Sequence, residues 1–586
     1  MKCSRKFAFS ALAAMASLFA GAMETLSLDG LWDFRFEKGR MLEDAAKTSE
    51  FKANDKMIVP GCWNSMSRYY NQQGTGLYRT SVELESDVVN AFVVIEGFGL
   101  RAKVFVDSRD VGTSVQPWST VEFATGPLKA GKHEIVIAVD CTSNKGKVKM
   151  FQDYYDFYPF GGLYQGVSIM LQKSPVALRN VFVRTRDYKT GLVELEAVFE
   201  GKDAPENFTA SVSFDKLPRQ KVAFTGRRAK MNVPAFRLWS HNEPNLHTVT
   251  VEVPDADAAV TERFGIRQVG TANGRITLNG KSVYIKGVNR HESHYSYGAS
   301  SPVQQMYEDI TLVKDLGGNF IRGSHYPQCR KFLSLCDELG ILVWEETLGW
   351  GNTTGHFKDQ KFCDLQIEAA KIMVRRSINH PSVIISGFLN EPQSDAPSCK
   401  VLIDKLIDTI RAEDTGHLIT FAANRNSSDI CHEKTDIIAY NTYPGWYGYI
   451  PMSGTSEEMR SSIRRCHADV VKYYRGKFKD NRPIICSESG VKADYGVRDP
   501  RGKAQMTEDF QSEYTRLMLE EVFANKDLAG IAIWQMTDAK TYTRRSSGIT
   551  VRSYGVNTGG LFDLYRRPKL SVDTARDVFT SKSEED

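Results

Sequence analysis

One stretch of the sequence decides the fold: Asn379-His-Pro-Ser-Val-Ile-Ile-Ser-Gly-Phe-Leu-Asn-Glu391-Pro392. The apolar run at residues 383–389 is too short for a helix and is typical of a strand that is buried on both faces. The polar pair Asn390-Glu391 follows the run, and Pro392 stops the strand. Carboxylates at the C-terminal ends of buried parallel strands carry the chemistry of barrel enzymes. Taken alone, Glu391 could equally well be a loop residue that caps the next helix.

A second segment, Pro483-Ile-Ile-Cys-Ser-Glu488-Ser-Gly490, repeats the pattern of a short apolar run that ends in a carboxylate. Glutamates on two different strands of one barrel can face each other across a pocket. Cleavage of a glycosidic bond uses such a pair, with one carboxyl group as the acid and the other as the nucleophile. The second segment therefore favours a catalytic role for Glu391 over a capping role.

From residue 267 to residue 586, short apolar segments alternate with amphipathic segments of helical period. This pattern predicts a (β/α)8 TIM barrel with active-site residues at the C-terminal ends of the strands. Thr455-Ser-Glu-Glu458 is a capping box that begins one helix, and Gly340 and Gly476 are expected C-caps. The eight predicted strands are 283–288, 319–322, 341–345, 383–389, 418–422, 437–440, 484–487 and 530–534.

The first half of the chain is rich in short alternating strands separated by Gly, Asp and Asn, which predicts two β-sandwiches. We expect an N-terminal jelly-roll β-sandwich of the sugar-binding type at residues 23–173. An immunoglobulin-like β-sandwich at residues 174–266 would act as a spacer. Late in the first sandwich, aromatic residues gather at positions 151–162. They are either ordinary core residues or part of a loop that reaches a neighbouring sugar site.

Residues 1–22 have the features of a signal peptide: a positive start, an apolar run at 7–19 and the small-residue site Ala20-Gly-Ala22. We therefore expect an exported protein, periplasmic or secreted. No later stretch approaches about 18 uninterrupted apolar residues, so no membrane span is expected in the mature chain.

Charge and cysteine usage restrict the partners. The formal net charge of +4 is small for 586 residues, and no basic block is present, so no nucleic-acid partner is expected. Nine of the ten cysteines follow the signal peptide; they are scattered and form no Cys-x-x-Cys pair. Neither a zinc site nor a disulfide framework is predicted, although one disulfide stays open.

Chemically active side chains follow most of the predicted barrel strands. Two histidines beside several carboxylates argue against a purely structural set. There is no Gly-rich phosphate loop, no Ser nucleophile elbow and no His-x-x-x-His pair, which favours hydrolysis without a metal or cofactor. In chain order the strand-end residues are His291, His325, Glu345, Glu346, Asn390, Glu391, Tyr443, Glu488 and Trp534.

Four motifs make the mature chain similar to glycoside hydrolase family 2, the family of β-galactosidase, β-glucuronidase and β-mannosidase. They are Gly287-Val-Asn-Arg-His-Glu292, Arg322-Gly-Ser-His-Tyr-Pro327, Asn379-His-Pro-Ser382 with Asn390-Glu391-Pro392, and Pro483-Ile-Ile-Cys-Ser-Glu488. The resemblance implies a retaining exo-acting β-glycosidase that works by double displacement.

The same resemblance assigns roles to single residues. It makes Glu391 the general acid/base and Glu488 the nucleophile, and it places Asn390 on the sugar 2-hydroxyl. Asp156, from the first sandwich, matches an acidic residue that reaches the sugar hydroxyls, and Tyr443 is an expected hydrogen-bond donor to the nucleophile. The residues expected to line the pocket of the terminal sugar are His291, His325, Tyr443, Trp446, Tyr447 and Trp534.

The identity of the sugar depends on conflicting motifs. The first two motifs are most similar to β-galactosidase, which predicts a terminal β-D-galactoside. The end of the barrel is more similar to β-glucuronidase, so a β-glucuronidase or β-galacturonidase is the alternative. Glucuronidases share an Asn-x-Lys that grips the uronate, whereas this chain has Asn557-Thr558-Gly559. The carboxylate grip would then be atypical, with Arg544, Arg545 and Arg552 either supplying the charge or lying in solvent.

A non-catalytic carbohydrate-binding protein is the alternative from another class. The presence of both Glu391 and Glu488 argues against it, because a decayed site would lose one of them. The expected partner is an oligosaccharide or glycoside. The aglycone, the linkage and a homo-oligomeric state stay open.

Overall fold

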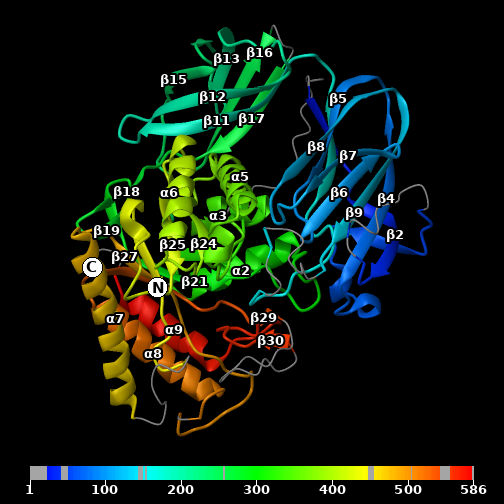
Figure 1. Cartoon of the computed structure of the whole chain (residues 1–586). Coiled ribbons are helices and arrows are strands. Elements are labelled where there is room, and N and C mark those ends of the chain that lie inside the picture. Colours follow the sequence, from blue (N-terminus) through cyan, green and yellow to red (C-terminus); the bar gives the residue numbers. More distant parts are fainter. Residues whose placement is uncertain are drawn as a thin grey trace, which may run out of the picture.

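The computed structural model describes residues 23–40, 42, 51–142, 150–151, 155–254, 258–446, 455–502, 504–541 and 555–583. Two β-sandwiches precede a closed parallel barrel, which confirms the predicted fold class (Figure 1). The expected signal peptide at residues 1–22 lies outside the described residues. No helix in the described part of the chain is both long and apolar enough to cross a membrane.

The barrel closes from the first strand to the eighth, and every neighbouring pair is parallel. The predicted first strand, 283–288, starts too early, because Val283 belongs to the preceding strand β20 (Lys281–Val283). β20 pairs antiparallel with β19 (Arg275–Leu278) outside the barrel. Each of the other seven overlaps a strand of the barrel. The strands are β21 (Ile285–Arg290), β22 (Phe320–Gly323), β23 (Leu342–Glu346), β24 (Val383–Asn390), β25 (Leu418–Ala423), β26 (Ile438–Asn441), β27 (Ile484–Ser489) and β28 (Leu528–Ile533).

The helix ends show which local signals were sufficient. Thr455 forms the predicted capping box with Glu458, and Gly340 is a left-handed C-cap with φ 72°. The prediction for Gly476 is wrong: its helix ends two residues later and is capped by Lys479 at φ 55°. The ring of Phe478 stacks on Tyr474, 6.2 Å between centroids, and this packing extends the helix past the glycine. The helices are α2 (Val303–Asp315), α3 (Arg330–Leu339), α4 (Thr354–Phe357), α5 (Gln360–Ser377), α6 (Pro397–Ala412), α7 (Ser456–Phe478), α8 (Glu508–Ala524) and α9 (Leu570–Ser581).

The N-terminal sandwich packs two antiparallel sheets over an apolar core that includes Trp32, Phe34 and Trp63. A separate cluster joins it to the barrel, where the Trp118 ring stacks on Tyr326 at 4.2 Å between centroids. One sheet contains β1 (Met23–Ser27), β10 (Val167–Gln172), β5 (Val88–Ile95) and β8 (Val121–Leu128). The other contains β3 (Asp55–Val59), β2 (Gly30–Lys38), β4 (Gly74–Leu84), β9 (Gly131–Asp140), β6 (Arg101–Val106) and β7 (Arg109–Ser114).

The second sandwich is fixed to the barrel by Asn379, the first residue of the stretch that decides the fold. Its side-chain amide donates to the carbonyl oxygen of Val181 and accepts from the amide of Val183, both at 2.9 Å. The sheets are β11 (Ala177–Asp187), β12 (Leu192–Glu200) and β15 (Arg228–Asn232), and β14 (Gln220–Phe224), β13 (Phe208–Phe214), β16 (His247–Val253) and β17 (Ala258–Phe264). β18 (Val269–Ala272) pairs with β19 where the chain enters the barrel.

Candidate active site

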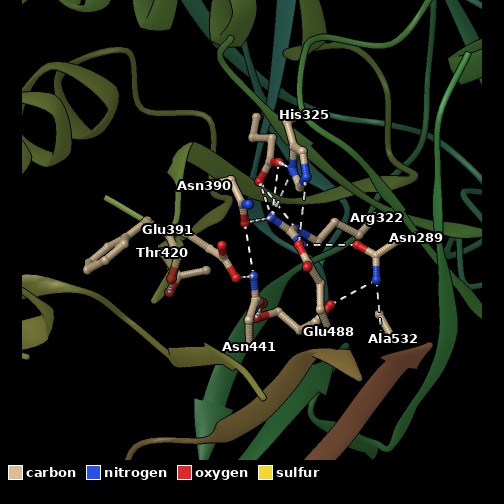
Figure 2. A network of polar contacts seen from close by, with 12 residues as sticks. Asn289, Arg322, His325, Asn390, Glu391, Thr420, Asn441, Glu488 and Ala532 are labelled. Atoms are coloured by element: carbon tan, nitrogen blue, oxygen red, sulfur yellow. Dashed lines mark hydrogen bonds and ion pairs between the residues drawn. The ribbon is translucent and has the colours of Figure 1, made fainter. Parts of the chain in front are cut away.

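The C-terminal ends of six barrel strands bring one polar network together (Figure 2). Parallel strands in a closed barrel end on one face, so residues far apart in sequence meet there. All of them except Glu391, which is partly exposed, are buried. The members are Asn289, Arg322, Glu346, Asn390, Glu391, Asn441 and Glu488.

Glu488, near the end of β27, is 3% exposed and is held by two donors. Nη1 of Arg322 lies 2.6 Å from Oε1, and the Tyr443 hydroxyl donates to Oε2 at 2.6 Å. Each carboxylate oxygen therefore has its own donor, and one of the donors is a cation. This arrangement stabilises negative charge on Glu488 and fixes the carboxylate in one orientation.

Glu391 leaves the end of β24 through an unusual backbone turn. Leu389 and Glu391 both have φ 50°, a left-handed conformation that residues other than glycine adopt infrequently. The regular pairing of β24 with β25 is interrupted between Gly387 and Asn390, and the amide of Glu391 donates to the carbonyl oxygen of Ala422 at 2.8 Å. This turn directs the Glu391 side chain into the network.

The pKa of Glu391 is raised to about 7. Burial is the main cause, the negative charge of Glu488 is the second, and Asp156 adds to the rise. A hydrogen bond from Asn441 and the charge of Arg322 act in the opposite direction. At neutral pH Glu391 can therefore give up a proton or take one, which is what a general acid/base requires.

Arg322, at 0% exposure, connects the network. Besides Glu488, its guanidinium donates to both oxygens of Glu346 at 3.0 Å, to Asn390 Oδ1 at 2.9 Å and to Asn289 Oδ1 at 3.0 Å. A buried guanidinium needs such partners, because its desolvation is otherwise expensive. The result is a fixed positive charge that binds Glu488 and also acts on Glu391.

His325 and Trp534 form a stacked pair next to this charge, with ring centroids 5.4 Å apart and planes within 9°. Nδ1 of His325 lies 2.6 Å from Oε1 of Glu346. Burial lowers the pKa of His325 to about 3, so the imidazole is neutral and Nδ1–H is the donor. Burial also raises the pKa of Glu346 to about 7, against the pull of Arg322.

The loop of the N-terminal sandwich reaches this face of the barrel. The Phe157 ring lies 5.5 Å from His291 and 6.5 Å from His325, between centroids. The negative charge of Asp156 is among the causes that raise the pKa of Glu391. His291 in turn has its ring edge-on to Trp534 at 5.4 Å. The aromatic stretch fits both interpretations: its rings are buried in the apolar cluster between the sandwich and the barrel, and Phe157 reaches the two histidines at the strand ends.

Three further residues expected at the site are either outside the polar network or outside the described residues. Trp446 is 1% exposed and packs at 6.5 Å from Phe510 in the barrel core. Tyr447 lies outside the described residues, as do Arg544, Arg545 and Arg552. Asn557 is 1% exposed; its Oδ1 accepts from the amide of Gly559 at 3.3 Å. Within the described part of the chain, its Nδ2 has no hydrogen-bond partner.

Sequence reasoning assigned no role to four members of the network: Asn289, Arg322, Glu346 and Asn441. All four stood in the segments at strand ends, so their position was a usable signal. The guanidinium of Arg322 is the clearest case, since an arginine on a buried strand is rarely without carboxylate partners.

No cluster of three or more His, Cys, Asp or Glu side chains that could hold a metal ion occurs in the described residues. The nine cysteines of this part of the chain are free thiols, and eight are buried. Two carboxyl groups meet at the strand ends: that of Glu391, whose pKa is raised to about 7, and that of Glu488, which accepts hydrogen bonds from Arg322 and Tyr443.

Two family models match the chain. The one described as "Glycosyl hydrolases family 2, TIM barrel domain" covers residues 269–581, and "Glycosyl hydrolases family 2" covers residues 176–267. A beta-glucuronidase from Canis lupus familiaris is 29% identical over 448 residues, which cover 73% of this chain and 65% of that protein. One from Sus scrofa is 27% identical over 447 residues, covering 72% and 65%. The chain thus spans 65% of the length of these relatives.

Solved structures extend the similarity to almost the whole chain. A GH2 beta-galacturonidase from Eisenbergiella tayi bound to galacturonate has a TM-score of 0.84 and 25% identity, and the match covers 97% of this chain and 99% of that one. A beta-glucuronidase from Bifidobacterium dentium complexed with coumarin-3-O-glucuronide has a TM-score of 0.84 at 20% identity, covering 96% and 98%. At 20% identity, the second match shows only that the two chains have the same fold.

Proposed function

Because the chain belongs to glycosyl hydrolase family 2, we propose that it is a retaining exo-β-glycosidase that removes a terminal β-linked uronic acid, a glucuronide or a galacturonide. The observation that carries the catalytic part is the contrast between Glu391, whose pKa is raised to about 7, and Glu488, which is held by Arg322 and Tyr443. The choice of sugar rests on the comparisons, which favour a uronide over the β-galactoside that the first two motifs predicted.

In the first step Glu488 attacks the anomeric carbon while the bond from that carbon to the leaving oxygen breaks. Glu391 gives its proton to the leaving oxygen, so the aglycone departs as a neutral alcohol. The products of this step are a glycosyl ester on Glu488 and an ionised Glu391.

In the second step Glu391 removes a proton from water, and the water oxygen displaces Glu488 from the anomeric carbon. Formation of the ester has already removed the negative charge on Glu488, which was one cause of the raised pKa of Glu391. The pKa of Glu391 therefore falls when it must act as a base and rises again when Glu488 is released.

Asn390 is oriented for the sugar by two donors. Its Oδ1 accepts from Nη2 of Arg322 at 2.9 Å and from Nδ2 of Asn441 at 3.1 Å. The amide nitrogen of Asn390 is then directed away from both donors. We assign this nitrogen to the 2-hydroxyl of the terminal sugar, where its hydrogen bond strengthens in the transition state.

A uronate requires donors for its own carboxylate. Strand β29 (Ala539–Lys540) pairs with β30 (Val556–Asn557), so the segment between them leaves and returns beside Asn557. Asn557 offers an amide nitrogen that is buried and unpartnered within the described residues. Arg544, Arg545 and Arg552 stand between the two strands in the sequence and outside the described residues; we propose them as the source of positive charge in place of the absent lysine.

A panel of 4-nitrophenyl β-glycosides tests the proposal: glucuronide, galacturonide, galactoside, glucoside and mannoside. We expect kcat/KM to be highest for one of the two uronides by at least about 100-fold, since removing the carboxylate leaves buried donors unpaired. Preference for the galactoside would restore the first prediction. No hydrolysis of any member, with binding of a glycoside retained, would indicate the carbohydrate-binding alternative.

A further inference from the structure

We infer that Asn441 is a positioning residue for proton transfer: its side-chain amide decides which oxygen of Glu391 carries the proton and, at the same time, aligns Asn390. This inference rests on the proposed glycosidase function. Asn441 is the last residue of β26 and is 2% exposed. Its Nδ2 lies 3.0 Å from Oε1 of Glu391 and 3.1 Å from Oδ1 of Asn390 (Figure 2).

The orientation of the Asn441 amide is determined by its surroundings. The carboxylate oxygen of Glu391 and the amide oxygen of Asn390 both accept hydrogen bonds, so the NH2 group must face them. On the other side, the Ser487 hydroxyl donates to Oδ1 of Asn441 at 2.8 Å. A flipped amide would lose all three hydrogen bonds.

The backbone around Asn441 is equally fixed. Its Cα is in register with Glu488 on the neighbouring strand, and the next amide, of Thr442, donates to the carbonyl oxygen of Glu488 at 2.9 Å. The carbonyl oxygen of Asn441 accepts from Nδ2 of Asn426 at 2.8 Å. Asn441 therefore cannot follow Glu391 if the latter rotates, and it defines one position for the Glu391 carboxyl group.

A protonated carboxyl group donates from one oxygen and accepts at the other. Since Oε1 of Glu391 accepts from Asn441, the proton is carried on Oε2, the oxygen left for the leaving group. Removing the amide would allow the proton to sit on either oxygen and the carboxyl group to rotate. Proton donation would then be slowed most for the leaving groups that need it most.

Asn441 also affects the ionisation of Glu391. The charged groups that act on Glu391 are Glu488 on β27, Arg322 on β22 and Asp156 on the loop of the first sandwich. Loss of the Asn441 hydrogen bond leaves burial, Glu488 and Asp156 opposed by Arg322 alone, which raises the pKa of Glu391 further. The acid form then persists to higher pH, and the alkaline limb of the activity profile moves upward.

The experiment compares Asn441→Ala with the wild type on a phenyl and a 4-nitrophenyl glycoside of the preferred sugar. We expect kcat/KM to fall by about 100-fold or more for the phenyl glycoside and by about 10-fold for the activated 4-nitrophenyl glycoside. The alkaline limb should move to higher pH. Asn207→Ala, at an exposed asparagine of the second sandwich, is the matched control and should change neither value.

Asn441→Asp keeps the shape and replaces the NH2 group by an acceptor, so it covers the case in which the alanine variant does not fold. It should move the alkaline limb further upward than Asn441→Ala. Equal losses on both substrates with an unmoved alkaline limb would overturn the inference and make Asn441 a structural residue. If the wild type hydrolyses none of the glycosides in the panel, the proposed function fails instead.

Discussion

Glu391 and Glu488 both follow a short apolar run at a barrel strand end, yet their carboxyl groups have different neighbours. Glu488 is buried and receives one hydrogen bond from a cation and one from a phenol. Glu391 is partly exposed and receives its hydrogen bond from the neutral amide of Asn441. One sequence pattern thus gives two electrostatic environments, because the neighbouring strands supply different hydrogen-bond donors to the two carboxyl groups.

The largest expected effect is that of Glu488→Gln, which removes the nucleophile with almost no change in shape. We expect kcat on a 4-nitrophenyl glycoside to fall by at least about 10⁴-fold, because no other group can form the covalent ester. Steady-state kinetics and trapping of the intermediate with a 2-fluoro sugar measure this. Activity within about 10-fold of the wild type would show that Glu488 is not the nucleophile, and the contrast drawn between Glu391 and Glu488 would then be wrong.

Glu391→Gln tests the other carboxyl group. Its effect should differ between a glycoside with a poor leaving group and one with an activated leaving group. We expect losses of about 10²- to 10⁴-fold on a phenyl glycoside and clearly smaller ones in the first step on an activated glycoside. In the wild type, kcat/KM should fall above a pH of about 7, where Glu391 loses its proton. That alkaline limb should disappear in the variant; if it stays unchanged, another group is the acid.

Arg322→Met tests the charge that separates the two glutamates. It leaves Glu346 and Glu488 buried without their cation, which should lower the free energy of unfolding by about 3–5 kcal/mol. Urea denaturation at neutral pH measures the change. Arg219→Met, at a half-exposed arginine paired with Glu252, is the control and should cost less than about 1 kcal/mol. Equal effects would show that Arg322 is not the centre of the network.

The smallest expected effect is that of Tyr443→Phe, which removes one hydrogen bond from Glu488 and leaves Arg322 in place. One hydrogen bond to a charged group contributes about 1.5–3 kcal/mol, so kcat should fall by about 10- to 100-fold. The alkaline limb set by Glu391 should stay where it is. A shift of that limb would show that Tyr443 acts on both glutamates.

The barrel and its strand ends could be predicted because the strands are short apolar runs, most of which are followed by polar residues. Glu391, Glu488 and His325 were recognised for that reason, and the structure brings them into one network. Pairwise geometry could not be predicted. That Arg322 would bind four partners on four other strands depends on side-chain directions across the barrel, which no local pattern encodes.

One local signal failed at a helix end, where a contact between two side chains of the same helix prevailed over it. Gly476 is a good C-cap by composition, but the stacking of Phe478 on Tyr474 carries the helix beyond it. Trp446 was expected at the pocket through resemblance; its ring lies 6.5 Å from Phe510 and outside the polar network, so its place in the pocket stays a prediction. The preference for one sugar was the weakest prediction, because it depends on loops rather than on the periodic strands.

The anchoring of Asn379 gives the second sandwich more importance than that of a spacer. Eight-residue strand β24 runs between this anchor, bound to Val181 and Val183, and the turn that presents Glu391. One end of this segment thus binds the second sandwich, and the other end carries Glu391, the proposed proton donor. Exchange or deletion of the second sandwich would remove the hydrogen bonds that hold Asn379. We therefore expect the second sandwich and the barrel to be inherited, or engineered, together.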